Sequence, residues 1–190
     1  MTEHVKSIVK SVNFHLRNIN RIRRYITQDS CHHLVRSLVL QRIDYANSTL
    51  YGITVKDSQK LQRLQNRAAR IVFRQHRMHP SAPLLKQLHW LPVDSRIIFK
   101  LMLLTFKRFH GLLPSYLSDL LPVYVPGRPN LRSGDDGLLL HVPRTHLAAG
   151  DKCFSTAAPS IWNSLPIRIR QCTSTTSFKK ALKTHLFPKD

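Results

Sequence analysis

Apolar residues return at helical spacing in three long segments of this chain, and that periodicity constrains its fold more than any other feature. In residues 5–26 an apolar side chain recurs every three or four positions, with polar residues between. This pattern is typical of an amphipathic helix, which buries one side and exposes the other. The same spacing predicts a second helix ending between residues 44 and 50, and a third over residues 57–74. Three helices with short connections predict a small helical bundle.

Prolines and glycines punctuate the rest of the chain and separate shorter predicted elements. Residues 96–110 are apolar around most of a helical circumference, so we expect this helix to form the centre of the core and to end at Gly111. Residues 138–147 form a short apolar run with a central proline, which favours one or two short edge strands. Further helices are predicted around residues 84–88, at 159–163 and at 175–186. The expected fold class is therefore mainly α.

The predicted elements divide the 190 residues into four segments. Residues 122–137 hold three prolines and three glycines and are typical of an irregular linker, so they are the favoured boundary. We expect a helical bundle at 1–75, an apolar helical core segment at 76–121, the linker at 122–137, and a small C-terminal extension of mixed short strands and helices at 138–190.

The charge balance predicts a polyanionic partner. The chain has 30 Lys and Arg against 10 Asp and Glu, a formal net charge of +20 with neutral histidines. A charge of this sign attracts nucleic acids and anionic surfaces. No apolar run approaches the roughly 18 residues of a membrane span, and the first residues lack the apolar stretch of a secretory signal. We therefore expect an intracellular protein without a membrane partner.

The sequence offers no constellation of catalytic or metal-binding residues. Asp135 and Asp136 are adjacent carboxylates, but they lie in a Ser-Gly-Asp-Asp-Gly turn, which by itself explains their presence. His32 and His33 diverge by about 100° on a helix, so they do not face one metal ion. The three cysteines are far apart and lack CxxC spacing, which favours reduced thiols. We expect no catalytic residue, no metal and no cofactor.

Basic residues follow the predicted helices at helical spacing and are the best candidates for a binding site. On the helix at 57–74 four arginines lie 4, 3 and 4 positions apart, which places them within an arc of about 60°. No acidic residue occurs between Ser58 and His89 to neutralise them. A second stripe follows the first helix. The predicted nucleic-acid-binding residues are Arg63, Arg67, Arg70 and Arg74, with Lys6, Lys10, Arg17, Arg21 and Arg24.

Such stripes would contact phosphates without reading bases, which predicts binding that does not depend on sequence. The alternative is a solvated or partner-facing helix surface, because any surface helix carries a charged face opposite an apolar one. Trp90 and Trp162 are candidates for base stacking, but each has apolar neighbours and a nearby proline. For these two tryptophans, packing in the core is the favoured interpretation.

Seven phrases, in their order along the chain, resemble the C-terminal region of the non-LTR (LINE-type) retrotransposon reverse transcriptase polyprotein, the part that follows the polymerase palm. The resemblance covers nearly the whole chain from about Val5. The phrases are IDYANSTLYG at 43–52, LQRLQNRAARIV at 61–72, LLKQLHWLPVDSRIIFKLMLLTFKRFHG at 84–111, PSYLSDLL at 114–121, VPRT at 142–145, GDKCFSTAAPSIWNSLP at 150–166 and FKKALKTHLF at 178–187.

This resemblance implies that residues up to about 75 are similar to the polymerase thumb, a helical bundle that packs against the template-primer duplex. The remainder would be the C-terminal extension of that family. The palm with its catalytic aspartates would precede residue 1, so we expect this chain to be a non-catalytic fragment. The implied partner is RNA or an RNA–DNA duplex. Arg67 departs from the family phrase, which often has alanine at that position.

The alternative to nucleic-acid binding is a structural or protein-interaction module, or an inert remnant of the family protein. The apolar helix at 96–110, and the surface that an absent palm would leave uncovered, are candidates for binding a partner protein or for self-association.

Overall fold

The computed structural model describes residues 2–125 and 138–187, and it confirms the mainly α fold. The chain forms two compact units, Met1–Ile97 and Ile98–Asp190. The division falls inside helix α6 (Val93–Phe109), whereas the sequence favoured a boundary at 122–137. Most of that predicted linker, residues 126–137, lies outside the described residues, as do Asp135 and Asp136.

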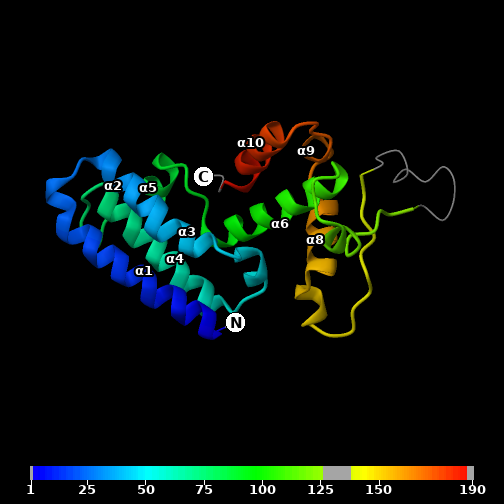
Figure 1. Ribbon diagram of the computed structural model, residues 1–190, viewed down its shortest axis with the longest axis horizontal. Coiled ribbons are helices and arrows are strands. Elements are labelled where there is room, and N and C mark those ends of the chain that lie inside the picture. Colours follow the sequence, from blue (N-terminus) through cyan, green and yellow to red (C-terminus); the bar gives the residue numbers. More distant parts are fainter. Residues whose placement is uncertain (1, 126–137, 188–190) are drawn as a thin grey trace. The chain divides into compact units, whose positions relative to one another are not determined.

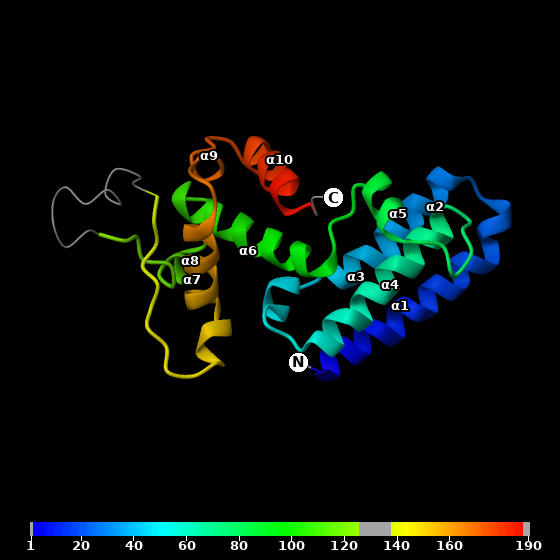
Figure 2. The ribbon, with the colours of Figure 1, turned by 180° about the vertical axis from the view of Figure 1, so that it is seen from behind.

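The first unit is a three-helix bundle. Its first helix is α1 (Thr2–Ile22), which continues into the 3₁₀ turn η1 (Arg23–Tyr25). The second is a rod made of α2 (Gln28–Val35), the π-helical segment η2 (Arg36–Leu40) and α3 (Gln41–Asp44). After the 3₁₀ turn η3 (Asn47–Leu50), the third is α4 (Val55–Val72). The rod runs antiparallel to α1 and α4, which therefore run parallel and side by side (Figures 1 and 2).

Apolar faces at the predicted helical spacing form the core of this bundle. On α1 the buried residues are Val5, Ile8, Val12, Leu16 and Ile19. On α4 they include Leu61, Leu64, Ala68, Ile71 and Val72. The periodicity prediction for both helices is confirmed, because each buries the side that carries its apolar residues.

Helix α4 begins earlier and ends earlier than the sequence predicted. Thr54 caps its N-terminus by accepting a hydrogen bond from the Asp57 amide at 3.2 Å, so the helix starts at Val55 and not at residue 57 or 58. At the other end Arg74 adopts a left-handed conformation with φ of 53°. The amides of Arg74 and Gln75 donate to the carbonyls of Ile71 and Arg70, which is a Schellman motif. Arg74 therefore lies beyond the helix.

The segment that follows is held against α4 by the amide side chains of two glutamines. Helix α5 (Ala82–Gln87) ends in a second Schellman motif, in which His89 is left-handed with φ of 54°. The buried Gln65 side chain donates to the Leu91 carbonyl at 2.8 Å. Gln62 accepts from the Val93 amide at 2.8 Å. These contacts fix the chain as it enters α6.

The second unit is helical and has an aromatic core. It holds most of α6, then α7 (Ser115–Ser118), the 3₁₀ turn η4 (Gly150–Lys152), α8 (Phe154–Ser164), α9 (Ile167–Arg170) and α10 (Thr175–Leu186). The rings of Phe106 and Phe178 stack with centroids 4.2 Å apart, and those of Phe109 and Trp162 with centroids 5.2 Å apart. Gly111 ends α6, as predicted, with φ of 64°.

The two tryptophans are core residues, as the sequence favoured. Trp90 is 5% exposed and Trp162 is fully buried. The indole N–H of Trp162 donates to the Leu138 carbonyl at 2.6 Å, which satisfies its polar group inside the core. Neither ring has a free face for stacking on a nucleic-acid base.

The edge strands predicted at 138–147 are wrong. Within the described residues this segment contributes a single antiparallel bridge, between Val123 and Leu140. Leu140 instead exchanges two hydrogen bonds with the side-chain amide of Asn163, at 3.0 and 2.8 Å. A side chain on α8 thus occupies the backbone groups that a second strand would have paired.

Candidate nucleic-acid interface

The parallel pairing of α1 and α4 places the two predicted basic stripes next to each other. At the start of both helices, the side chain of Thr2 lies close enough to the Asp57 carboxylate to help lower its pKa. Arg67 donates to the Asn13 side chain near their middle, at 3.1 Å. Arg23 donates to the Ile71 carbonyl at their ends, at 2.9 Å. The two helices therefore stay side by side along their length, at the roughly 8–10 Å axis separation of packed helices.

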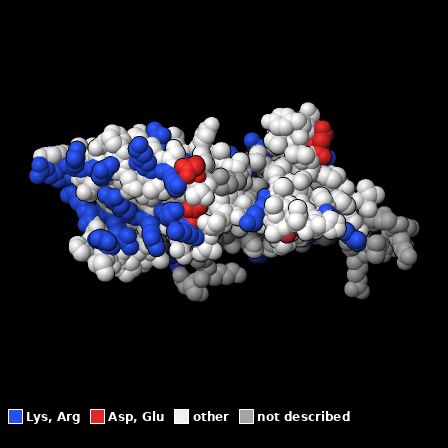
Figure 3. Space-filling model, turned by 90° about the horizontal axis from the view of Figure 1, so that it is seen from below, with Lys and Arg blue, Asp and Glu red and all other residues white. Residues whose placement is uncertain are grey.

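Six of the nine predicted residues form a continuous exposed surface on this pair, which we call the basic face. Lys6, Lys10, Arg17 and Arg21 are exposed on α1, and span about 22 Å along the helix axis at 1.5 Å per residue. Arg63 and Arg67 are exposed on α4. In Figure 3, lysine and arginine side chains gather over the side of the molecule where α1 lies, with few acidic side chains among them.

Most cations of the basic face are available to a ligand. Within the described parts of the chain, Lys10, Arg21 and Arg63 have no side-chain hydrogen bond or ion pair. Arg17 donates only to the Asn13 carbonyl, at 3.4 Å. Arg67 uses one Nη to reach Asn13, which leaves most of its five N–H donors for a phosphate.

Arg70 and Arg74 are not on the basic face, although the sequence placed them there. Arg70 is half-buried, and its Nε donates to the His79 carbonyl at 2.8 Å. Arg74 reaches across to η1, where its guanidinium donates to the carbonyls of Arg23 at 3.0 Å and of Ile26 at 3.3 Å. Both arginines hold loops in place, so we no longer propose them as phosphate contacts.

Arg24 lies just past the end of α1 and stays exposed. Its guanidinium lies over the ring of Tyr25, 4.6 Å from the ring centroid. On α1, Phe14 is 55% exposed among the basic residues. Exposed aromatic rings between cations are the usual platforms for unpaired bases. The sequence prediction considered only the tryptophans for this role and missed these two rings.

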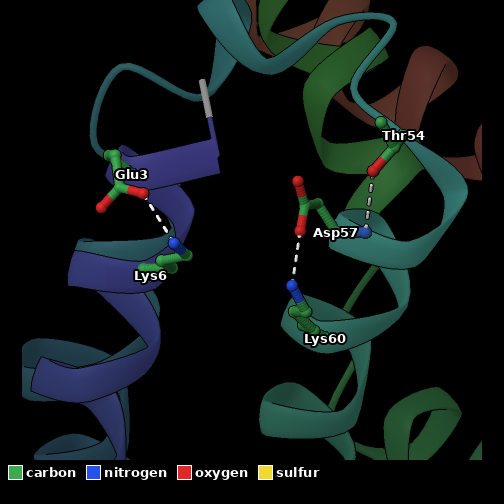
Figure 4. Close-up of polar contacts among 5 residues, drawn as sticks. All are labelled: Glu3, Lys6, Thr54, Asp57 and Lys60. Carbon is green, nitrogen blue, oxygen red and sulfur yellow. Dashed lines mark hydrogen bonds and ion pairs between the residues drawn. The ribbon is translucent and has the colours of Figure 1, made fainter.

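The acidic residues beside the basic face lie at the start of its two helices. Glu3 accepts from Lys6 at 2.6 Å on α1, and Asp57 accepts from Lys60 at 2.8 Å on α4 (Figure 4). Carboxylates in the first turn of a helix interact favourably with its dipole, so both have a structural explanation. The hydrogen bond from Lys60 holds the pKa of Asp57 below its usual value.

A buried arginine that the sequence prediction missed closes the far end of the same helix pair. Arg23 is 7% exposed and donates to the carbonyls of Ile26, Ile71 and Val72. The only sequence signal was its position outside the arc of the basic stripe, beside Ile22 and Ile19.

Cys31 lies near the Arg23 guanidinium. Burial raises the pKa of the Cys31 thiol, and the charges of Arg23 and Arg74 oppose that rise.

Within residues 2–125 and 138–187, no group of three or more His, Cys, Asp or Glu side chains is placed to hold a metal ion. All three cysteines are free thiols. No helix in the described part of the chain is long and apolar enough to cross a bilayer. Comparison of the chain with protein-family models, with curated proteins and with solved structures gave no match in any of the three.

Proposed function

We propose that this chain binds nucleic acid through the phosphate backbone, without sequence preference and without catalysis. The observation that carries the proposal is the basic face itself, in which two parallel helices present six exposed cations and place their neighbouring acids at the helix starts. The first unit carries 17 Lys and Arg against 5 Asp and Glu. A surface of this kind attracts a polyanion by releasing its condensed counterions.

The resemblance to the region after the palm of non-LTR retrotransposon reverse transcriptases supports the same proposal. A thumb-like bundle would meet a template-primer duplex or its RNA strand through backbone contacts. On this proposal the chain is the nucleic-acid-holding part of such a polymerase, and RNA or an RNA–DNA duplex is its ligand.

The test compares two variants with the same change in net charge. The first carries Lys10→Gln, Arg21→Gln and Arg63→Gln, all on the basic face. The control carries Lys179→Gln, Arg36→Gln and Arg168→Gln, which are exposed elsewhere in the chain. The measurement is the affinity for a fluorescein-labelled 20-nucleotide single-stranded RNA, by fluorescence anisotropy at constant salt.

We expect the first variant to lose about tenfold or more in affinity, because it removes half of the proposed phosphate contacts. The control should stay within about threefold of the parent protein. Equal losses in the two variants would mean that only net charge matters, and would contradict the proposed interface. Unchanged binding in both, together with self-association in sedimentation, would favour the protein-interaction role.

A further inference from the structure

A second surface, on another side of α1, is hollowed into a groove. Between α1 and the rod of η2 and α3 lies a groove of about 470 Å³, within the range of small-molecule sites. Ser7 and Ser11 line it from α1, Gln41 and Arg42 line it from the rod, and Tyr45 lines it from the position just after α3. The groove lies wholly within the first unit.

The lining combines three kinds of group that together suit a nucleotide. Tyr45 is 74% exposed, so its ring offers a face for stacking. Ser7, Ser11 and Gln41 offer neutral donors and acceptors of the kind that pair with base edges. Arg42 supplies a cation for a phosphate.

The charge of Arg42 is not neutralised by the protein. The nearest acid in sequence, Asp44, accepts instead from the guanidinium of Arg96, with one of the two bonds at 2.8 Å. None of the residues lining the groove is a carboxylate, and Arg42 forms no ion pair within the described residues. A groove with an unneutralised arginine and no acid favours an anionic ligand.

The groove and the basic face share helix α1, and this argues for one particular occupant. Ser7 and Ser11 follow Lys6 and Lys10 directly in sequence, so the two surfaces are separated by about 100° around a single helix. Phe14, also exposed, lies on the side of the helix between them. A strand held on the basic face can therefore reach the groove by crossing one exposed flank of α1.

We infer that this groove binds one unpaired nucleotide of a single strand held on the basic face, with its base on Tyr45 and its phosphate at Arg42. This inference rests on the proposed function. It adds a preference that phosphate contacts alone do not create, because a paired base has its edge and faces occupied within the duplex. The protein should therefore favour single-stranded over double-stranded RNA.

The experiment measures the affinity of the full chain for a labelled 12-nucleotide single-stranded RNA and for the duplex of the same sequence. The variants are Tyr45→Ala, Tyr45→Phe and, as a matched control, Tyr116→Ala, which removes an equally exposed tyrosine in the second unit. We expect Tyr45→Ala to bind the single strand about tenfold more weakly, since base–aromatic stacking contributes roughly 1–3 kcal/mol per base. Its affinity for the duplex should change by less than about twofold.

Tyr45→Phe keeps the ring and should behave like the parent protein, as should Tyr116→Ala. An RNA carrying 5-iodouridine should form a photo-crosslink in the peptide that contains Tyr45. If Tyr45→Ala weakens both nucleic acids equally, or neither, the groove does not bind an unpaired base. In that case the triple variant at Lys10, Arg21 and Arg63 tests the proposed function separately. If it loses RNA affinity and its charge-matched control does not, the proposed function stands without the groove. If it loses no affinity, both the groove and the proposed function are overturned.

Discussion

The Nε atom of Arg23 lies 2.9 Å from the carbonyl oxygen of Ile71 and donates a hydrogen bond to it, from a residue 48 positions earlier in the chain. One Nη donates to the next carbonyl, of Val72, at 2.8 Å. The last carbonyls of a helix have no partner within it and carry partial negative charge. A buried guanidinium thus completes the end of α4 and ties it to the end of α1.

Replacing Arg23 with methionine should destabilise the first unit by about 2–4 kcal/mol, because it removes three hydrogen bonds of a buried guanidinium and leaves the Val72 carbonyl without its side-chain donor. Arg24→Met is the matched control, since Arg24 is adjacent but exposed, and its loss should cost less than about 1 kcal/mol. Urea denaturation followed by circular dichroism checks both values. Equal effects at the two positions would contradict a capping role for Arg23.

Arg74 should also behave as a structural residue. Arg74→Ala removes the hydrogen bonds to the Arg23 and Ile26 carbonyls, and we expect it to destabilise the fold by about 1–2 kcal/mol. Arg74→Gly loses the same bonds, but glycine adopts a φ of 53° without strain. It should therefore be more stable than the alanine variant by about 1 kcal/mol. The Tm of the two variants gives the order, and the reverse order would rule out strain at this position.

The slope of RNA affinity against salt concentration should report the number of phosphate contacts. With six cations engaged, log K for single-stranded RNA should fall against log salt with a slope of about −4, near 0.7 per contact. The triple variant at Lys10, Arg21 and Arg63 should have a slope of about −2. Anisotropy titrations between 50 and about 300 mM salt measure both slopes. A slope that is flat, or unchanged in the variant, is incompatible with the basic face as the interface.

Stability should depend on the charge of Asp57 at low pH. The hydrogen bond from Lys60 lowers the pKa of Asp57 in the folded protein below the unfolded value of about 3.9. The carboxylate therefore stabilises the fold above about pH 4, and this stabilisation is lost as the pH falls through the folded pKa. Asp57→Asn should lower the Tm at pH 7, with a difference from the parent that shrinks toward pH 2. A difference that stays constant with pH would show that the charge does not matter.

The sequence predicted the helices that are formed by patterns of residues close together in the chain. Helical spacing and density of apolar residues identified α1, α4 and α6. The prediction at 138–147 was wrong because an apolar run with β-forming residues does not reveal that a side-chain amide on α8 will satisfy its backbone.

Spacing along a helix also predicted which cations could share an arc. The sequence by itself therefore identified both basic stripes. Only the tertiary structure decided which of these cations stay exposed and which bind backbone carbonyls. It made α1 and α4 parallel neighbours, and it turned Arg70 toward a carbonyl of the segment after α4 and Arg74 toward carbonyls near the end of α1. It buried Arg23, which no stripe had included. Periodicity depends on residues three or four positions apart, whereas the hydrogen bonds of Arg23, Arg67 and Arg74 join residues 48 to 54 positions apart and exist only once the helices have packed.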